Sequence, residues 1–519
     1  MALHMANFDS SHKPRYALAL LFGIGFAASF PPSPLDWLAW FTLAPLFKLL
    51  EAKSPSRAFG LGWVWGTAHF VAIVYWIVVA VGHYGKLSIL TSIVPMLLLA
   101  FYLGLYPAVF CSALVLLKRT QLSIIWIPFA WVALEYARAN LFTGFPWCLV
   151  GYTQYNHPLF IQVASLFGVY GLSFAVVLIN WFCYQIFLSE DRGSPGRLVT
   201  RTLIAFFCVL GILWYGYYQL GSCTHVSNKG NKRLRIAIIQ PSIDQSVKWD
   251  PRFQTKTMEL YENLTRSVGP FKPDLIIWPE TATPFFFQSN KNLSRRILGL
   301  ARELGCPILF GSPAYQETPS GTKYFNRAYL LKPEGGAPQY YDKVHLVPFG
   351  EYIPAKKLLS FIGKLVPGAG DFMAGSSIAP LNLDGIDLGV LICFEAIFPE
   401  ISISEARQGA KFLVNLTNDA WFGKTSAPYQ HLAMSVFRAV ENRIPLVRAA
   451  NTGFSAIVDC SGKIQKKSRL FAQEVIVGTI TVMRSSRPTF YARYGDIFAQ
   501  CATFLSVLAF IVALTRRRK

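Results

Sequence analysis

Residues 388–395 read LGVLICFE, a short apolar run that ends at Cys393 and is followed by Glu395. A run of this length and composition is typical of a buried β-strand. A cysteine that ends such a strand is most often a small buried core residue. The thiol becomes a candidate nucleophile only if further reactive side chains follow neighbouring strands.

Two other segments show this pattern. Residues 274–280, DLIIWPE, end at Glu280, and residues 341–352, YDKVHLVPFGEY, carry Lys343 and Glu351. A thiol attacks a carbonyl as the thiolate, and a free cysteine with a pKa of about 8.5 is mostly protonated at neutral pH, so Cys393 needs a base. Glu280 can take the thiol proton and later a proton from an incoming amine. We therefore predict a catalytic site of Glu280, Lys343 and Cys393; the alternative is that Glu280 and Lys343 form only a structural ion pair.

These segments belong to a stretch, residues 222–494, in which short β-rich runs alternate with helical patterns. Helices are expected at 253–268, 292–304 and 429–442. Apolar strands separated by helices indicate an α/β domain whose helices cover the sheet faces. The expected strands are residues 234–240, 274–279, 307–311, 327–331, 388–393, 412–417, 446–450 and 475–481.

The rest of the chain is far more apolar. Hydrophobic residues make up 53% of the 519 residues and charged residues only 15%, which excludes an ordinary soluble protein. The composition predicts an N-terminal membrane domain at 1–221 with seven helices, and a C-terminal transmembrane helix with a basic tail at 495–519. The first two segments are short for a helix that crosses a bilayer. The eight apolar segments are residues 17–30, 37–50, 58–81, 87–117, 122–141, 159–188, 198–220 and 497–514.

Charge indicates the orientation of these segments. The net charge of +21 could suggest a nucleic-acid partner, but many basic residues cluster beside the apolar segments, the pattern that orients membrane spans. Alternate loops carry basic clusters, whereas the loops on the other side hold only Lys86. Eight spans with both termini in the cytoplasm satisfy this rule and place residues 222–494 outside the cytoplasm. The nine cysteines form no CxxC pair and no metal-ligand spacing, so neither structural zinc nor a disulfide framework is expected.

The three motifs, in this order and spacing, resemble the nitrilase superfamily of carbon-nitrogen hydrolases over residues 233–485. The resemblance implies an αββα sandwich in which Cys393 is the nucleophile, Glu280 the base and Lys343 the oxyanion-stabilising cation, assisted by the backbone N–H of Phe394. It implies that Glu351 and Glu395 orient the lysine and the catalytic glutamate. Phe394 departs from the family, in which a tyrosine often follows the nucleophile. The resemblance places no catalytic histidine at His345.

With seven spans before this domain and one after it, the whole chain resembles the apolipoprotein N-acyltransferases. That resemblance implies an inner-membrane enzyme with a periplasmic catalytic domain. A phospholipid, typically phosphatidylethanolamine, would acylate Cys393, and the α-amino group of a diacylglyceryl-modified apolipoprotein would then take the acyl chain. No cofactor or metal is implied. The rival hypotheses are a membrane-tethered amidase or nitrilase that hydrolyses a small amide, and a transporter or scaffold that carries a degenerate nitrilase module.

Four further residues are candidates for substrate binding. By resemblance, Trp249 and Trp421 match aromatic positions of the acceptor and lipid site; the alternative is that both are core or interfacial tryptophans. Glu135 and Arg138 lie three residues apart on one predicted span, so we expect them to pair. The resemblance puts such a pair near the phospholipid entry surface, but pairing that only fixes helix packing is an equal alternative. Residues 354–377, apolar and then glycine-rich, are predicted to form a mobile lid.

Overall fold

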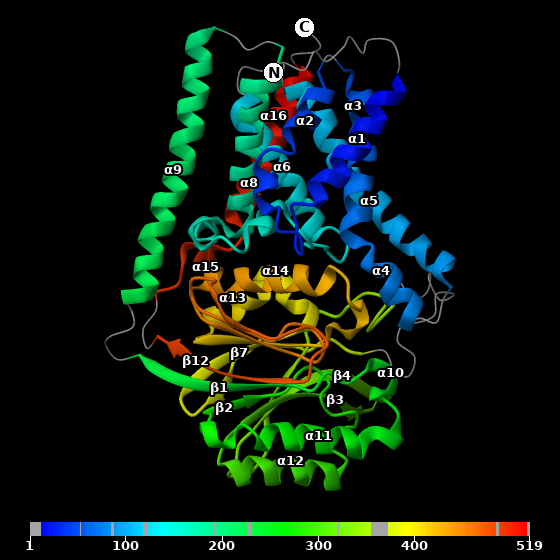
Figure 1. Ribbon diagram of the computed structural model, residues 1–519, viewed down its shortest axis with the longest axis vertical. Helices are drawn as coiled ribbons and strands as arrows, with labels where there is room; N and C mark the ends of the chain where they lie inside the picture. Colours follow the sequence, from blue (N-terminus) through cyan, green and yellow to red (C-terminus); the bar gives the residue numbers. More distant parts are fainter. Residues whose placement is uncertain are drawn as a thin grey trace.

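The computed structural model consists of a bundle of long helices and an α/β domain stacked at one end of it (Figure 1). The start of α1 and the end of α16 lie at the opposite end of the bundle. The structure describes residues 12–51, 53–84, 88–117, 123–190, 194–225, 231–319, 321–353, 372–483 and 487–515.

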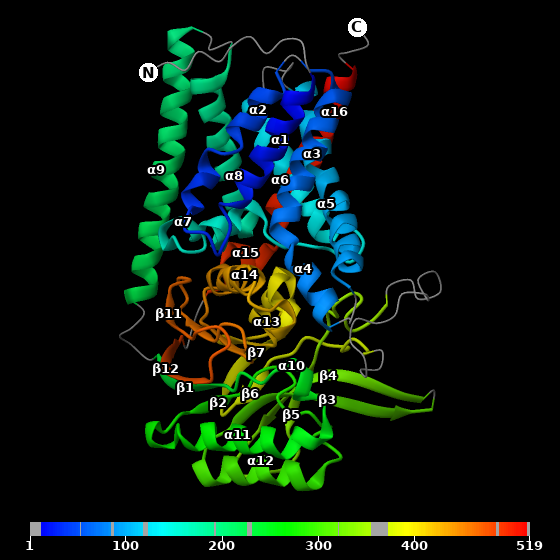
Figure 2. The ribbon, with the colours of Figure 1, turned by 45° about the vertical axis from the view of Figure 1, so that its right-hand side comes forward.

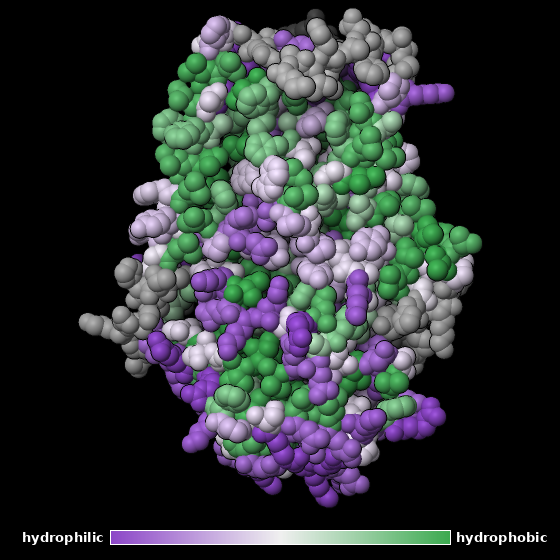
Figure 3. Space-filling view, viewed as in Figure 1, coloured by the Kyte–Doolittle hydropathy of each residue, from purple (hydrophilic) through white to green (hydrophobic). Residues whose placement is uncertain are grey.

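The bundle is built from apolar helices of unequal length. Among the described residues, three helices are long and apolar enough to cross a membrane, and a fourth is obtained if α3 and α4, bent by 47°, count as one span. Apolar side chains cover most of the visible surface of the bundle, whereas hydrophilic ones gather at the far end of the α/β domain (Figure 3). The elements are α1 (His12–Ala27), η1 (Asp36–Trp40), α2 (Ala44–Leu49), α3 (Pro55–Val74), α4 (Trp76–Val79), η2 (Ala80–Tyr84), α5 (Ile89–Leu117), α6 (Ser123–Asn140), η3 (Val150–Gln154), α7 (Pro158–Ile161), α8 (Ala164–Cys183), η4 (Tyr184–Leu188), α9 (Pro195–His225), α15 (Phe490–Tyr494) and α16 (Ile497–Thr515).

The apolar segment at residues 37–50 is not one helix. It is divided into η1 and α2, and Asn180 of α8 stabilises the break. The side-chain oxygen of Asn180 accepts hydrogen bonds from the backbone N–H groups of Leu43 and Ala44, at 2.9 and 3.2 Å. The Ala44 N–H also donates to the Phe41 carbonyl at 3.1 Å, so Asn180 provides an additional acceptor at the start of α2, where helix N–H groups lack intrahelical partners. A side chain distant in sequence therefore decides the local structure here.

The α/β domain contains two six-stranded sheets. The first has the order β12-β1-β2-β3-β4-β5, with β1, β2 and β3 parallel and the other pairs antiparallel. The second has the order β11-β10-β9-β8-β7-β6, with β7, β8 and β9 parallel. The strands are β1 (Lys232–Gln240), β2 (Leu275–Ile277), β3 (Ile308–Thr318), β4 (Gly321–Leu331), β5 (Gln339–Asp342), β6 (Leu381–Leu383), β7 (Ile386–Ile392), β8 (Phe412–Thr417), β9 (Leu446–Ala450), β10 (Ala456–Val458), β11 (Ile464–Lys467) and β12 (Glu474–Val482).

Helices cover the outer face of each sheet, which gives the expected αββα sandwich (Figure 2). Apolar side chains such as Ile236 of β1 and Val390 of β7 form the core between the sheets. Residues such as Ile239 face the other way and pack on Met258 and Ile297 of the outer helices. The helices and single turns are α10 (Gln245–Lys248), η6 (Pro251–Phe253), α11 (Gln254–Arg266), η7 (Gly269–Phe271), α12 (Lys291–Leu304), η8 (Cys393–Ile397), α13 (Pro399–Arg407), η9 (Asp419–Phe422) and α14 (Ala427–Asn442).

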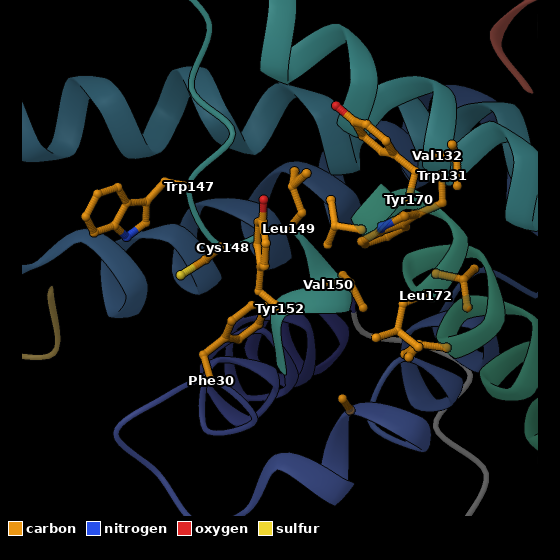
Figure 4. Packing of buried hydrophobic residues seen from close by; sticks show 14 of the residues in the cluster. Phe30, Trp131, Val132, Trp147, Cys148, Leu149, Val150, Tyr152, Tyr170 and Leu172 are labelled. Carbon is orange, nitrogen blue, oxygen red and sulfur yellow. The ribbon is translucent and has the colours of Figure 1, made fainter. Parts of the chain in front are cut away.

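The sandwich and the bundle share one hydrophobic core. Helix α14 lies between the second sheet and the bundle (Figure 1), and 15 of its 16 residues are buried. The loop that follows α6 packs in the same cluster as residues of α6 and α8 (Figure 4). In this loop the indole N–H of Trp147 donates to Gln430 Oε1 of α14 at 2.7 Å. The catalytic candidates are thus held next to the membrane helices by buried contacts.

Candidate active site

Three strand-end loops bring the predicted catalytic residues together. Glu280 follows β2, Lys343 follows β5, and Cys393 follows β7 at the first position of η8. The three side chains are buried, with Lys343 only 1% exposed. Lys343 Nζ lies 3.9 Å from Glu280 Oε1, and Cys393 belongs to the apolar cluster between the two sheets.

Lys343 is held between two carboxylates. Its Nζ lies 2.8 Å from Glu351 Oε2 and 3.9 Å from Glu280 Oε1. The side-chain amide of Asn326 links the same carboxylates by donating to Glu280 Oε1 at 2.8 Å and to Glu351 Oε1 at 2.9 Å. Burial alone would lower the pKa of Lys343, but the charges of Glu351 and Glu280 outweigh it and raise that pKa. The lysine is therefore a permanent cation beside the thiol.

Glu395 ties the nucleophile loop to the lysine loop. Its Oε2 accepts the backbone N–H of Ile392 at 2.7 Å, and its Oε1 accepts the N–H groups of Val344 and His345 at 2.7 and 3.1 Å. Tyr341 also donates its hydroxyl to Oε1. The loops that carry Lys343 and Cys393 are consequently fixed to each other through one buried carboxylate.

The backbone at Cys393 is strained and firmly held. Its φ is +53°, in the left-handed region that non-glycine residues avoid, and such residues cluster at functional sites. The Cys393 carbonyl accepts hydrogen bonds from His431 Nε2 at 3.1 Å and from Asn415 Nδ2 at 3.4 Å. These bonds fix the turn at which β7 ends and η8 begins.

The buried ion pair of Asp419 and Arg448 holds His431 in place. Asp419 Oδ1 lies 3.0 Å from His431 Nδ1, and Asp419 Oδ2 lies 2.8 Å from Arg448 Nη2. Burial would raise the pKa of Asp419, but Arg448 and His431 reverse this effect and hold that pKa below its ordinary value. Burial and the charge of Arg448 lower the pKa of His431. His431 Nε2 donates to the Cys393 carbonyl, while its Nδ1 lies 3.0 Å from both Asp419 Oδ1 and Arg448 Nη2.

The electrostatics of the site favour proton transfer that accompanies attack. Burial, reinforced by the carboxylate of Glu280, raises the pKa of Cys393, although Lys343 opposes this shift. Burial also raises the pKa of Glu280, which Lys343 again opposes. Both shifts favour the protonated, neutral thiol at rest and give the Glu280 carboxylate a raised basicity.

Sequence reasoning missed several residues that hold this site. Asn326, Lys248 and His431 come from three different elements, and each is a single polar residue in an otherwise unremarkable segment. Asn415, Asp419 and Arg448 lie inside apolar or strand-like runs. Polar residues at positions that periodicity assigns to the core were the only available signal.

Comparison with known proteins gives two matches to family models. Residues 22–182 match the apolipoprotein N-acyltransferase N-terminal domain, and residues 235–487 match the carbon-nitrogen hydrolase family. A protein from Geobacter metallireducens named apolipoprotein N-acyltransferase is 44% identical over 521 residues, covering 100% of this chain and 98% of its own length. The chain belongs to the apolipoprotein N-acyltransferase family.

Other apolipoprotein N-acyltransferases match most of the chain at lower identity. The protein of that name from Methylococcus capsulatus is 33% identical over 92% of both chains. Among solved structures, a carbon-nitrogen hydrolase from Helicobacter pylori G27 matches with 16% identity and a TM-score of 0.37, covering 48% of this chain and 89% of its own. An amidase from Nesterenkonia sp. matches with 21% identity and a TM-score of 0.36, covering 52% and 95%.

The region shared with the N-terminal family model contains Glu135 and Arg138, and the expected direct pairing between them is wrong. Glu135 Oε1 accepts the backbone N–H of Val150 at 2.8 Å, whereas Arg138 Nη1 donates to the carbonyl of Trp147 at 2.8 Å. Both side chains bind the loop after α6 because its carbonyl and N–H groups need partners inside an apolar bundle. They line an internal cavity of about 30 Å³ together with His69.

The remaining candidates lie around the triad. Trp249 follows α10 and is 40% exposed, and Trp421 is half-buried in η9. Phe394 is half-buried, and its ring contacts that of Phe398 edge to face at a centroid distance of 5.1 Å. His345 stacks on Phe398 at 3.7 Å. The lid predicted for residues 354–377 falls mostly outside the described residues.

Within the described residues, no group of three or more histidine, cysteine or acidic side chains is arranged to hold a metal ion.

Proposed function

We propose that this chain transfers a fatty acyl chain from a membrane phospholipid to the α-amino group of the diacylglyceryl-modified N-terminal cysteine of apolipoproteins. The observation that carries the proposal is the convergence of Glu280, Lys343 and Cys393 in an αββα domain that packs on apolar helices through α14. A freestanding hydrolase offers its acyl-enzyme to water, whereas this site lies beside the bundle. Phosphatidylethanolamine is the proposed donor.

The first half-reaction acylates the enzyme. Glu280 takes the thiol proton while Cys393 Sγ attacks the ester carbonyl of the phospholipid. The resulting oxyanion is stabilised by the charge of Lys343, and the backbone N–H of Phe394 is the proposed second donor. The intermediate collapses, the carbon–oxygen ester bond breaks, and the lysophospholipid leaves with the proton from Glu280. A thioester at Cys393 remains.

The second half-reaction releases the acyl chain. The free amino group of the apolipoprotein attacks the thioester carbonyl, and Glu280 accepts a proton from the amine. Breakage of the carbon–sulfur bond regenerates Cys393, which recovers a proton from Glu280. Throughout, Glu351 holds Lys343, and Glu395 holds the two loops together. We assign Trp249 and Trp421 to the binding of acceptor and lipid. Trp249 follows Lys248, which bonds the Glu280 carbonyl, and Trp421 lies two residues after Asp419, which holds His431.

The distribution of charge along the sequence supports a topology that completes this proposal. We infer that residues 1–221 form a seven-helix membrane domain, 222–494 the catalytic domain and 495–519 a final span with a basic tail. Positively charged loops alternate along the sequence, which supports eight spans in the inner membrane, with both termini cytoplasmic and the catalytic domain periplasmic. For Glu135 and Arg138, contacts with the loop after α6 support a role in fixing that loop rather than in direct lipid binding.

The test is to trap the intermediate. Purified full-length enzyme is incubated with phospholipid alone, and intact-protein mass spectrometry should show one acyl group on Cys393 that neutral hydroxylamine removes. A diacylglyceryl peptide with a free amino terminus should discharge it, whereas an acetylated peptide should not. If Cys393→Ala retains acyl transfer, the covalent route is wrong. If small amides are hydrolysed without any lipid requirement, the chain is instead a tethered carbon-nitrogen hydrolase.

A further inference from the structure

Lys248 is a second buried lysine in the site. It ends α10 and is only 3% exposed. Its Nζ donates to Thr281 Oγ1 at 2.6 Å and to the Glu280 carbonyl at 3.3 Å. Among the ion pairs of the described residues none includes Lys248, so its hydrogen bonds go to neutral groups. Both acceptors belong to the turn that carries the proposed general base.

That turn is strained. Thr281 has a φ of +45°, and its β-branched side chain makes the left-handed region especially unfavourable. Gly311 of β3 packs against the same turn: a Cβ there would lie 2.5 Å from the Thr281 nitrogen and 2.8 Å from the Glu280 Cα. A strained turn persists only when its surroundings overdetermine it. Lys248 contributes by bonding both the main chain and the side chain of the turn.

The charge of Lys248 also reaches the reacting groups. Burial lowers the pKa of Lys248 to about 8, while the charges of Glu280 and Cys393 act in the opposite direction. The other groups that act on Glu280 are the Lys343 cation, the Glu351 carboxylate and the Asn326 amide. The charge of Lys343 is paired with the Glu351 carboxylate at 2.8 Å, whereas no ion pair of the described residues includes Lys248. Its positive charge is therefore available to Glu280.

We propose that Lys248 is a positioning residue for the general base: it fixes the Glu280–Thr281 turn and, in its charged form, keeps the Glu280 carboxylate ionised. The inference rests on the proposed function in taking Glu280 as the base. Glu280 needs to be ionised to accept the thiol proton, yet burial favours its neutral form. The Lys248 cation bonds the backbone carbonyl of Glu280, not its carboxylate oxygens, and its charge opposes protonation of that carboxylate.

The experiment compares Lys248→Met, which has similar length but no charge, with Lys248→Arg, which keeps the charge. Lys256→Met on the exposed face of α11 is the matched control. Two rates are measured across pH on full-length protein: acylation of Cys393 by phospholipid, and alkylation of Cys393 by iodoacetamide. The alkylation rate requires no lipid or lipoprotein, so it reports on the site whether or not the proposed function is correct.

For Lys248→Met we expect at least about a tenfold loss of both rates at neutral pH, and an acidic limb displaced to higher pH, because loss of a cation makes Glu280 and the thiol harder to ionise. Lys248→Arg should have the acidic limb of its pH–rate profile at the wild-type position. Lys256→Met should match the wild type in both rates. A Lys248→Met enzyme with an unchanged limb, at full or uniformly reduced rate, overturns the inference. If alkylation shifts as expected while no variant, wild type included, forms a thioester from lipid, the inference stands and the proposed function fails.

Discussion

Glu351 holds Lys343 by a buried ion pair of 2.8 Å between Oε2 and Nζ. The carboxylate is fixed in turn, because Oε2 accepts the backbone N–H of Val347 at 2.8 Å and Oε1 accepts from Asn326. Lys343 is thus held at one position, next to the thiol. Removing one member of a buried ion pair leaves the other charge uncompensated, which strongly destabilises the folded protein.

Glu351→Gln should therefore leave Lys343 without its nearest countercharge. We expect acylation of Cys393 to fall by about 10- to 100-fold and the free energy of unfolding to fall by about 3 kcal/mol. Single-turnover thioester formation and thermal unfolding measure the two effects. Glu317→Gln on the exposed β3–β4 hairpin is the control, and equal behaviour of the two variants would show that the ion pair is dispensable.

Lys343→Met should remove the proposed oxyanion partner. Loss of one such donor costs about 3 to 4 kcal/mol in the transition state, which corresponds to a rate loss of about 10²- to 10³-fold. Lipid binding by this variant should change little, so the loss should appear in the rate of acylation at saturating phospholipid. A loss confined to lipid affinity would assign Lys343 to substrate binding.

The rate of acylation should rise with pH through the pKa of Glu280. Burial raises that pKa above the ordinary range, and the ionised form that accepts the thiol proton is present only above it. Glu280→Gln should lose most of the rate together with this limb of the pH profile. An intact limb in the slow variant would mean that another group, such as Glu351, is the base.

Gly311→Ala should disable the enzyme by displacing the Glu280 turn. The added Cβ would lie 2.5 Å from the Thr281 nitrogen, and that contact is with backbone, which cannot move aside cheaply. The matched change Gly299→Ala, on α12 where nothing lies within 4 Å of the new Cβ, should keep activity and stabilise the helix by up to about 1 kcal/mol. Thioester formation and thermal unfolding of both variants test this, and an active Gly311→Ala enzyme would contradict the rigid turn.

The proposed topology can be checked with reporter fusions. A phosphatase that is active only outside the cytoplasm should be active when fused after Lys232 and inactive when fused after Lys519. The basic residues at 516–519 should remain in the cytoplasm because they follow the last apolar segment. The opposite pair of results would invert the topology.

The central elements of the fold were predictable because they are apolar and continuous. Each of the eight expected strand runs overlaps a strand, and all three expected helices are present. The strands β5, β6, β10 and β11 were missed because each has only three or four residues, and in β11 the polar IQKK sequence also hides any periodicity. These segments form strands because they pair antiparallel with a neighbouring strand along the chain, not because of a local sequence pattern.

The convergence of the three proposed catalytic residues was predictable because each follows an apolar strand or lies in a recognisable motif. Asn326 and His431 were not, because their roles depend on which chain segments meet in three dimensions. The spacing of Glu135 and Arg138 gave a wrong pairing for the same reason: spacing places two residues on one helix face but cannot reveal a loop that offers better partners. Similarly, Asn180 divides a predicted span from a position more than 130 residues away.

Helix α14 is enclosed by the sandwich on one side and by the bundle on the other. The face of α14 that packs on the bundle is therefore too apolar to be exposed to water. Excision at residue 231 would expose residues such as Phe437 and Val440, and would remove the Tyr152 hydroxyl to which Nη2 of the buried Arg438 donates at 3.0 Å. A fragment lacking the bundle should therefore aggregate or demand detergent even though it contains both sheets. The bilayer-embedded half behaves as a folding partner, not merely as a tether, and soluble expression of the catalytic half will need a redesigned α14 surface.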